Sequence, residues 1–180
     1  MADQQPASGG NGSGENGNEP QVSILAQYIK DLSVENPSAP QVFSWQVQPS
    51  LDVQFNIAVN AAAENVHEVT LKVEINAKSE NGVHFVVDLS YAGLFGLRNI
   101  PEEALQPFLL IEAPRTIFPF ARQVIAEAVS NTGFPPLLLD PIDFGAAYMA
   151  QLQAAQQQGE ADATGEAPAE ATADEGSGEA

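Results

Sequence analysis

The most constraining feature of this sequence is a strict alternation of apolar and polar residues, which recurs three times between residues 47 and 91. In residues 47–60 the odd positions are apolar and the even positions are mostly polar, and residues 66–78 and 83–91 repeat the pattern. Because successive side chains of a strand point to opposite faces, each segment predicts a strand with one dry and one wet face. The connections at 61–65 and 79–82 are short, and Asn81-Gly82 is a strong turn signal, so we expect antiparallel hairpins.

A further strand is predicted over residues 22–35, where the alternation is less regular. Strict alternation divides its side chains into a face with Ile24, Ala26, Tyr28, Leu32 and Val34 and a face with Leu25, Ile29, Asp31, Ser33 and Glu35. Leu25 and Ile29 then lie on the outer face, which indicates that something covers this part of the strand. A second copy of the chain would provide such a cover.

After Tyr91 the pattern changes to a helical one. Pro101, followed by two acidic residues, opens one helix, and apolar residues at helical spacing predict a second helix over 114–130. Pro107 and Pro119 are expected to interrupt or kink this region, and Gly133 to end it. Asp143 is placed to cap a last helix that carries Phe144, Ala147, Tyr148 and Leu152 on one stripe. The prediction is an α+β fold, in which a four-stranded antiparallel sheet, either a meander or a Greek key, carries helices on its dry face.

The two ends of the chain differ in composition from this region. Residues 1–20 and 153–180 contain almost no large apolar side chains, so we expect two disordered tails around one folded domain, 21–152. The chain has a net charge of −18, and residues 21–152 hold 6 basic and 14 acidic residues, a net charge of −8. Such a charge disfavours binding to nucleic acid or to anionic membranes and favours a basic protein surface as partner.

Catalytic and metal chemistry has little support in the sequence. The chain has no cysteine and only two histidines, and it lacks nucleophile-elbow, zinc-protease and phosphate-loop motifs. We expect His67 to be a hydrogen-bonded packing residue and His84, beside a turn, to be solvated. The prediction is therefore a protein that is not an enzyme and binds neither metal nor cofactor. Because no signal peptide or membrane-spanning stretch is recognisable, we also expect it to be cytoplasmic.

Two features remain as candidates for function. The wet face of the sheet collects acidic residues from all four strands, which is either a docking surface for a basic segment or an ordinary solvated face. The loop 134–142, FPPLLLDPI, holds too many large apolar side chains for a surface loop. It either closes the core or, together with Phe43, Trp45 and the Phe144/Tyr148 stripe, lines an aromatic groove.

Several separated motifs of the chain resemble the SecB family of protein-export chaperones. They are YIKDLSVENP at 28–37 with Ala39-Pro40, YAGLF at 91–95, PRTIFPFAR at 114–122, and GFPPL at 133–137 with Pro141. They occur in the order and at the spacing of the family, and the resemblance extends from about residue 24 to residue 152.

The resemblance implies a bacterial cytoplasmic homotetramer, assembled as a dimer of dimers, that holds unfolded secretory precursors in hydrophobic grooves without ATP. By resemblance, the client-binding groove contains Phe120, Phe134, Leu137, Leu139, Phe144 and Tyr148. The family also delivers its clients to the SecA ATPase, whose basic, zinc-bearing C-terminal segment docks on the acidic face. The matching docking residues are Asp31, Glu35, Val86 and Asp88. Neither nucleic-acid binding nor direct membrane insertion is implied.

Other functions remain open on the sequence alone. A SecB-like protein can serve as a dedicated chaperone or adaptor for a single partner, as in toxin–antitoxin systems, and would then bind one preferred client. A small-molecule or lipid carrier would instead use the Phe/Leu cluster as an enclosed pocket and would be a monomer or dimer.

Overall fold

The computed structural model describes residues 19–150, 152 and 153, and the chain divides into two units after Phe144. The first unit contains the sheet and the long helical segment. Of the second unit, residues 145–150, 152 and 153 are described, and they are helical, as the last predicted helix requires. The predicted tails, 1–20 and 153–180, lie almost entirely outside the described residues.

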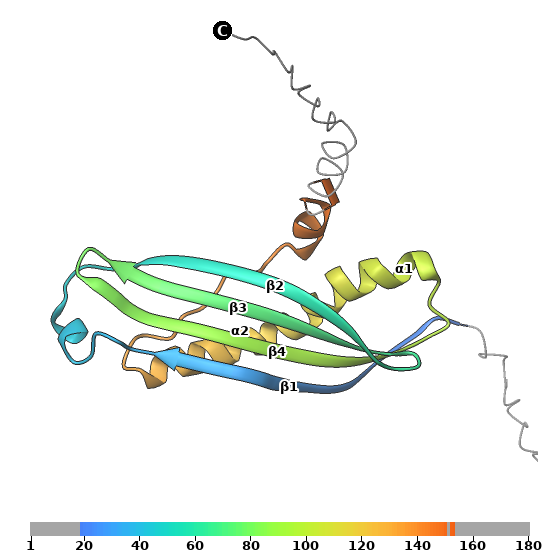
Figure 1. The fold of residues 1–180 in the computed structure, drawn as a ribbon, viewed down its shortest axis with the longest axis horizontal. Helices are drawn as coiled ribbons and strands as arrows, with labels where there is room; N and C mark the ends of the chain where they lie inside the picture. The colour runs from blue at the N-terminus through green and yellow to red at the C-terminus, as the bar shows by residue number, and fades with distance from the viewer. Residues whose placement is uncertain (1–18, 151, 154–180) are drawn as a thin grey trace, which may run out of the picture. The chain divides into compact units, whose positions relative to one another are not determined.

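The sheet consists of four antiparallel strands, β1 (Gln21–Glu35), β2 (Ser50–Ala63), β3 (Val66–Ser79) and β4 (Gly82–Arg98), in the order β1-β4-β3-β2 (Figure 1). Two tight hairpins join β2 to β3 and β3 to β4. The connection from β1 to β2 contains the short helix η1 (Gln41–Ser44) and returns the chain to the far edge of the sheet. Of the two predicted topologies, the observed one is the Greek key.

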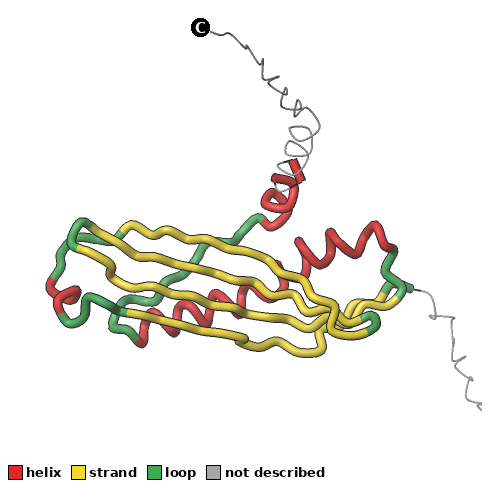
Figure 2. Tube along the Cα trace, viewed as in Figure 1, coloured by secondary structure: helices red, strands yellow, loops and turns green. Residues whose placement is uncertain are grey.

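The helical segment is continuous from α1 (Glu102–Pro107) through a π-helical stretch, η2 (Phe108–Glu112), into α2 (Ala113–Asn131) (Figure 2). The start after Pro101 and the second helix are confirmed, and the π-helical interruption directly follows Pro107. Pro119 lies inside α2 without ending it. Gly133, at φ +92°, follows the end of α2, as predicted.

The core lies between α2 and one face of the sheet, which we call the helix face. α2 packs mainly against β3 and β4, and its buried side chains, which include Ile117, Ala121 and Ile125, recur at helical spacing. The odd-numbered residues of β3 and β4, from Val69 to Ile75 and from Phe85 to Tyr91, are buried beneath it. The predicted dry faces of these two strands are therefore confirmed.

The predicted division of β1 into two faces is confirmed for residues 31–35 but is wrong for Ala26, Tyr28 and Ile29, which lie between two β-bulges. The register shifts between Ile24 and Ala26 and again between Ile29 and Asp31. Each extra residue reverses the alternation that follows it. As a result Ile29 pairs with Tyr91 on the helix face, whereas Tyr28 pairs with Ala92 on the opposite face.

The ends of two strands also differ from the prediction. β2 begins at Ser50 rather than at residue 47, and β4 continues to Arg98. The last part of β4, AGLFGLR, has apolar or glycine residues on both faces up to Leu97, so the sequence shows no alternation there. A Cβ at Gly93 would lie 2.8 Å from Ile117 Cγ2, so this glycine permits the close approach of α2 to β4.

Candidate functional site

The face of the sheet opposite α2 gathers the acidic side chains that the sequence places on its wet face. In the strand register Glu35 pairs with Val86, Asp31 with Ser90, and Glu74 with Asp88. The four predicted docking residues thus lie on neighbouring strands β1 and β4. The acidic residues of this surface, which we call the acidic face, are Asp31, Glu35, Asp52, Glu68, Glu74 and Asp88.

Basic side chains neutralise only part of the acidic face. Lys72 Nζ lies 2.7 Å from Glu74 Oε1 and 3.3 Å from Asp88 Oδ2. Among the described residues, Asp31 and Glu35 have no ion pair. Among the described residues Asp52 of β2 also has no ion pair, so negative charge is not neutralised on either edge strand of the face.

At the other end of the face, a side-chain cluster joins the edge strand β1 to β3. The Tyr28 hydroxyl donates a hydrogen bond to Glu68, and Lys30 Nζ lies 2.9 Å from the other oxygen of the same carboxylate. The hydrogen bond from Tyr28, and then the one from Lys30, hold the pKa of Glu68 below its ordinary value. The hydrogen bond to Glu68 raises the pKa of Tyr28. Glu68 is thus an anion with its bonding sites occupied, so it is a poor docking group.

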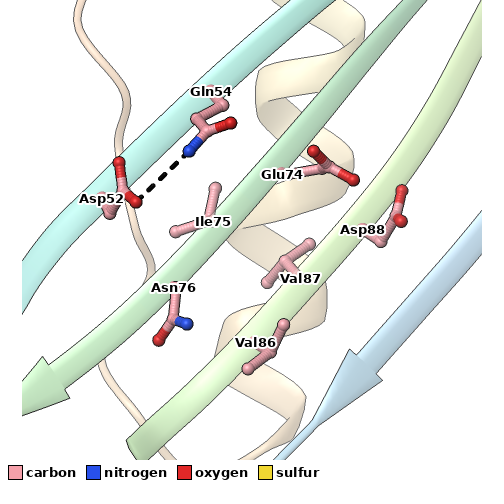
Figure 3. A pocket seen from close by; sticks show the side chains of 8 residues that line it. All are labelled: Asp52, Gln54, Glu74, Ile75, Asn76, Val86, Val87 and Asp88. Atoms are coloured by element: carbon pink, nitrogen blue, oxygen red, sulfur yellow. Dashed lines mark hydrogen bonds between the residues drawn. The ribbon is translucent and has the colours of Figure 1, made fainter. Parts of the chain in front are cut away.

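A shallow depression of about 240 Å³ lies in the acidic face, across β2, β3 and β4. Figure 3 shows the carboxylates of Asp52, Glu74 and Asp88 around it, with Gln54 hydrogen-bonded to Asp52 and Val86 at the edge. A depression lined by carboxylates next to a half-buried valine fits the mixed basic and apolar surface of a peptide better than a metal ion. In the part of the chain that the structure describes, no group of three or more His, Asp or Glu side chains is placed to hold a metal.

The helix face is not fully covered, which the sequence analysis did not anticipate. Leu51, Val53 and Phe55 of β2 point to the helix side, yet they remain 45 %, 38 % and 39 % exposed. We call them the β2 strip. A helix about 10 Å wide covers roughly two strands spaced about 4.8 Å apart, so a single helix leaves the outer strands of a four-stranded sheet bare. The sequence analysis predicts four strands but only one long helix, and this difference could have indicated the exposure.

β1 has a similar uncovered strip on the other side of α2. Val22, Ile24, Ile29 and Leu32 pair with helix-face residues of β4 and are 40–48 % exposed. Leu25, the first bulge residue, is 54 % exposed. The sequence-based expectation that this strand needs a cover is consistent with this exposure, although Ile29 lies on the face opposite to the predicted one.

The apolar loop divides into buried and exposed residues. Leu139 and Phe144 belong to the core, where Phe144 lies between Phe55 of β2 and Phe118 of α2 at ring distances of 5.9 and 6.0 Å. Phe134 and Leu137 are half-buried against the core, and Leu138 is 69 % exposed. Leu139 therefore closes the core, as the first interpretation of the loop predicts, whereas the aromatic groove stays a prediction.

An aromatic cluster lies at the β3–β4 hairpin. Phe134 contacts Phe43, His84 and Phe85 at ring distances of 5.7, 6.1 and 5.1 Å, and Trp45 stands edge-on to His84 at 5.0 Å. The prediction of a solvated His84 is wrong, because this residue is 4 % exposed and bonds to the Ser79 hydroxyl at 2.9 Å. Its position explains the error: the register shifts here, and His84 is the extra residue of the bulge.

The remaining predicted residues lie elsewhere. Phe120 is 47 % exposed on the outer side of α2, among polar residues, and is not in ring contact with the hairpin cluster. Tyr148 belongs to the second unit. His67 is half-buried on the helix face, and its Nδ1 has no hydrogen-bond partner among the described residues, so the hydrogen bond expected there is not formed at this atom.

These surfaces are typical of a protein that binds other polypeptides: one sheet face carries unpaired acidic groups, and the other carries exposed apolar strips beside a helix. Within residues 19–150, 152 and 153, no helix is long and apolar enough to cross a bilayer. The comparisons with known proteins identify the family. The SecB family, described as preprotein translocase subunit SecB, matches residues 15–155, and the chain belongs to it. It is therefore a member of a chaperone family and not an enzyme.

Close relatives share this description. The protein-export protein SecB of Zymomonas mobilis is 58 % identical over 134 residues, covering 74 % of this chain and 82 % of the relative. That of Erythrobacter litoralis is 51 % identical over 170 residues, covering 93 % and 92 %. Among solved structures, a SecB-like chaperone of Mycobacterium tuberculosis, in complex with a peptide from the HigA1 antitoxin, has a TM-score of 0.57 at 18 % identity. It covers 67 % of this chain and 90 % of that one, and supports the fold alone.

Proposed function

We propose that this chain is an ATP-independent holding chaperone of the bacterial cytoplasm, which keeps secretory precursors unfolded for export. The observation that carries the proposal is the β2 strip. A chaperone that holds unfolded proteins needs apolar side chains that are exposed and free to contact the client. Burying such surface contributes about 25 cal/mol per Å². Several client side chains on one surface therefore reach useful affinity even after the client's loss of conformational entropy.

The predicted client-binding residues are proposed to act in two ways. Phe120, Phe134 and Leu137 of the first unit, and Tyr148 of the second, would contact the client directly, in addition to the β2 strip. Leu139 and Phe144, which are buried, would support this surface from beneath. The role of Phe144 follows from its place against Phe55, because its removal would leave a residue of the β2 strip without support.

The acidic face is the proposed docking surface for the SecA ATPase, through the basic, zinc-bearing C-terminal segment of that partner. Asp31 and Glu35, whose charges are not paired, would provide the main attraction, with Asp88 and the apolar Val86 beside them. Electrostatic complementarity of this kind increases the association rate and weakens as salt concentration rises. Release of the client would then follow transfer to the motor and need no nucleotide bound by the chaperone.

The exposed strip of β1 is proposed to be covered in a homotetramer, a dimer of dimers. Five large apolar side chains on one edge strand are an aggregation risk for a monomer. Assembly would bury them and would bring several client-binding surfaces into one particle, so that one unfolded chain gains avidity by binding at several of them.

The experiment that tests holding is dilution of a denatured secretory precursor into buffer without nucleotide, followed by light scattering, with the native mass of the chaperone measured in parallel. We expect suppression of aggregation near one precursor per tetramer. The combined change Leu51→Thr and Phe120→Gln should weaken client binding by at least about tenfold, since burial of one large apolar side chain contributes about 1.5–3 kcal/mol.

The matched control is Thr116→Gln, which places the same new side chain on the exposed side of α2. It should leave holding unchanged. Equal aggregation with and without the wild-type protein would exclude general holding. It would favour the alternative of a dedicated chaperone for one partner, a use for which the antitoxin peptide bound by the M. tuberculosis SecB-like chaperone is a precedent.

A further inference from the structure

The acidic face contains a cation of its own. Lys72 projects from the middle of β3, between Asn56 of β2 and Ser90 of β4 in the register. Its ammonium bridges Glu74 and Asp88 at 2.7 and 3.3 Å, and these bonds raise the pKa of Lys72, the bond to Glu74 contributing most. Lys72 is therefore positively charged at neutral pH and lies beside one of the proposed docking carboxylates.

The position of this ammonium is the one that a docking cation would take. A lysine or arginine of a basic segment that binds Asp88 approaches Oδ2, the oxygen next to Lys72, because Oδ1 is enclosed. The side chains of Lys72, Glu74 and Asp88 are 42 %, 51 % and 35 % exposed. The bridge is thus open to solvent and weak, in the range of surface ion pairs, so an incoming cation can replace it.

Asp88 has a further property that favours such replacement. Its second oxygen, Oδ1, is enclosed and has no hydrogen-bond partner in the described part of the chain. A guanidinium group can bond to both oxygens of a carboxylate, which a single ammonium in this position does not do. Replacement of Lys72 by an arginine of the partner, with rotation of the carboxylate, would therefore satisfy an acceptor that is unpaired at present.

We propose that Lys72 is an intramolecular competitor for the basic docking partner, which lowers affinity at Asp88 and Glu74 and is displaced when that partner binds. This inference rests on the proposed docking function of the acidic face. Its consequence is a docking surface whose two parts differ in their attraction for a basic segment. The unpaired Asp31 and Glu35 attract a basic segment first, and Asp88 and Glu74 become available only when Lys72 leaves them.

The test compares Lys72→Ala with Lys78→Ala in the full chain, using the zinc-loaded C-terminal segment of SecA as the probe. Lys78 is a suitable control because it lies on the same face and strand but has no ion pair among the described residues. Both changes remove one positive charge and should increase the association rate similarly. Only Lys72→Ala should also slow dissociation of the SecA segment. The Lys72→Ala variant should therefore bind this segment about two- to fivefold more tightly than the Lys78→Ala variant does.

A double-mutant cycle makes the test specific. Asp88→Asn should reduce affinity more in the Lys72→Ala background than in the wild type, because Lys72 no longer neutralises the carboxylate. If Lys72→Ala equals Lys78→Ala, or weakens binding, while Asp88→Asn still weakens the wild type, the competitor role is wrong and the docking face stands. If neither Asp88→Asn nor Asp31→Asn changes affinity in any background, the docking face itself is wrong, and the role of Lys72 with it.

Discussion

At the scale of single residues, Gly93 sets the distance between α2 and the sheet. A Cβ there would lie 2.8 Å both from Ile117 Cγ2 and from the Phe95 ring, and both neighbours are buried. Ile117 is β-branched and cannot turn away, so the helix must shift. We expect Gly93→Ala to lower the free energy of unfolding by about 1–3 kcal/mol, the usual effect of overpacking a core. Urea denaturation at fixed protein concentration measures it.

Gly96 is the control for this prediction, because it lies in the same strand three residues further on. Its added Cβ would meet the hydroxyl of Ser23, which is exposed and can rotate with the loss of one long, exposed hydrogen bond to the Gly96 carbonyl. Gly96→Ala should therefore leave stability unchanged or raise it slightly, since glycine inside a strand is itself unfavourable. Equal destabilisation by the two variants would show that strand geometry, and not the approach of α2, requires a glycine at 93.

The sequence-based prediction of side-chain orientation failed at β-bulges, each of which is formed by a single extra residue. Leu25, Lys30 and His84 are each the extra residue at a register shift. In a sequence, a bulge is visible only as an exchange of the apolar and polar positions that follow it. In β1 both the odd and the even positions contain apolar residues, so the exchange cannot be recognised. The partition of β1 and the environment of His84 therefore required the pairing partners, which a single sequence does not contain.

At the scale of elements, a side-chain hydrogen bond connects β1 to β3 across the intervening strand β4. Tyr28 pairs with Ala92 of β4, and its hydroxyl donates a hydrogen bond to Glu68 of β3, the next strand. Because the hydrogen bond lowers the pKa of Glu68, its contribution to stability is present above the unfolded-state pKa, about 4.3, and is lost as pH falls through the folded-state value. This hydrogen bond helps to hold the edge strand β1, which two bulges interrupt, on the sheet.

Replacement of Tyr28 by phenylalanine tests this element. We expect Tyr28→Phe to lower the free energy of unfolding by about 0.5–1 kcal/mol at pH 7, and the difference from wild type to shrink towards zero below about pH 4. Tyr91→Phe, on the helix face, removes the same hydroxyl without touching Glu68 and should show no such pH dependence. A Tyr28→Phe effect that stays constant from pH 3 to pH 8 would contradict the assigned role of Glu68.

The elements themselves were predictable to a large extent. Alternation located β2 and β3 and most of β4, and helical periodicity with Pro101 and Gly133 located the helical segment. The core under α2 followed from the same patterns. What the sequence did not reveal was which apolar residues stay exposed, because Leu51 of β2 and Ile75 of β3 have the same pattern and differ only in their distance from α2. Burial depends on the covering element, and one helix does not cover four strands.

At the scale of the whole molecule, the register places the two proposed functions on opposite faces of one sheet. Residues that alternate along β2 belong to different surfaces: Asp52 and Gln54 face the acidic depression, whereas Leu51, Val53 and Phe55 form the β2 strip. The sheet between them is rigidly hydrogen-bonded along long strands, so charge changes on one face should not disturb packing on the other. The two proposed sites would therefore allow a client and the export motor to bind at the same time.

This arrangement predicts that the two functions can be lost separately. The combined change Asp31→Lys and Asp88→Lys should abolish most of the affinity for SecA at low salt and leave suppression of precursor aggregation intact, because it repels a basic partner without altering apolar surface. Leu51→Thr with Phe120→Gln should have the reverse effect. Each variant is measured for both properties, with the native mass as a check on assembly. If SecA affinity survived the charge reversal, the docking site would lie elsewhere on the chain. If either variant lost both functions with its mass unchanged, the two faces would be coupled through the sheet, and the separation argued from the strand register would be wrong.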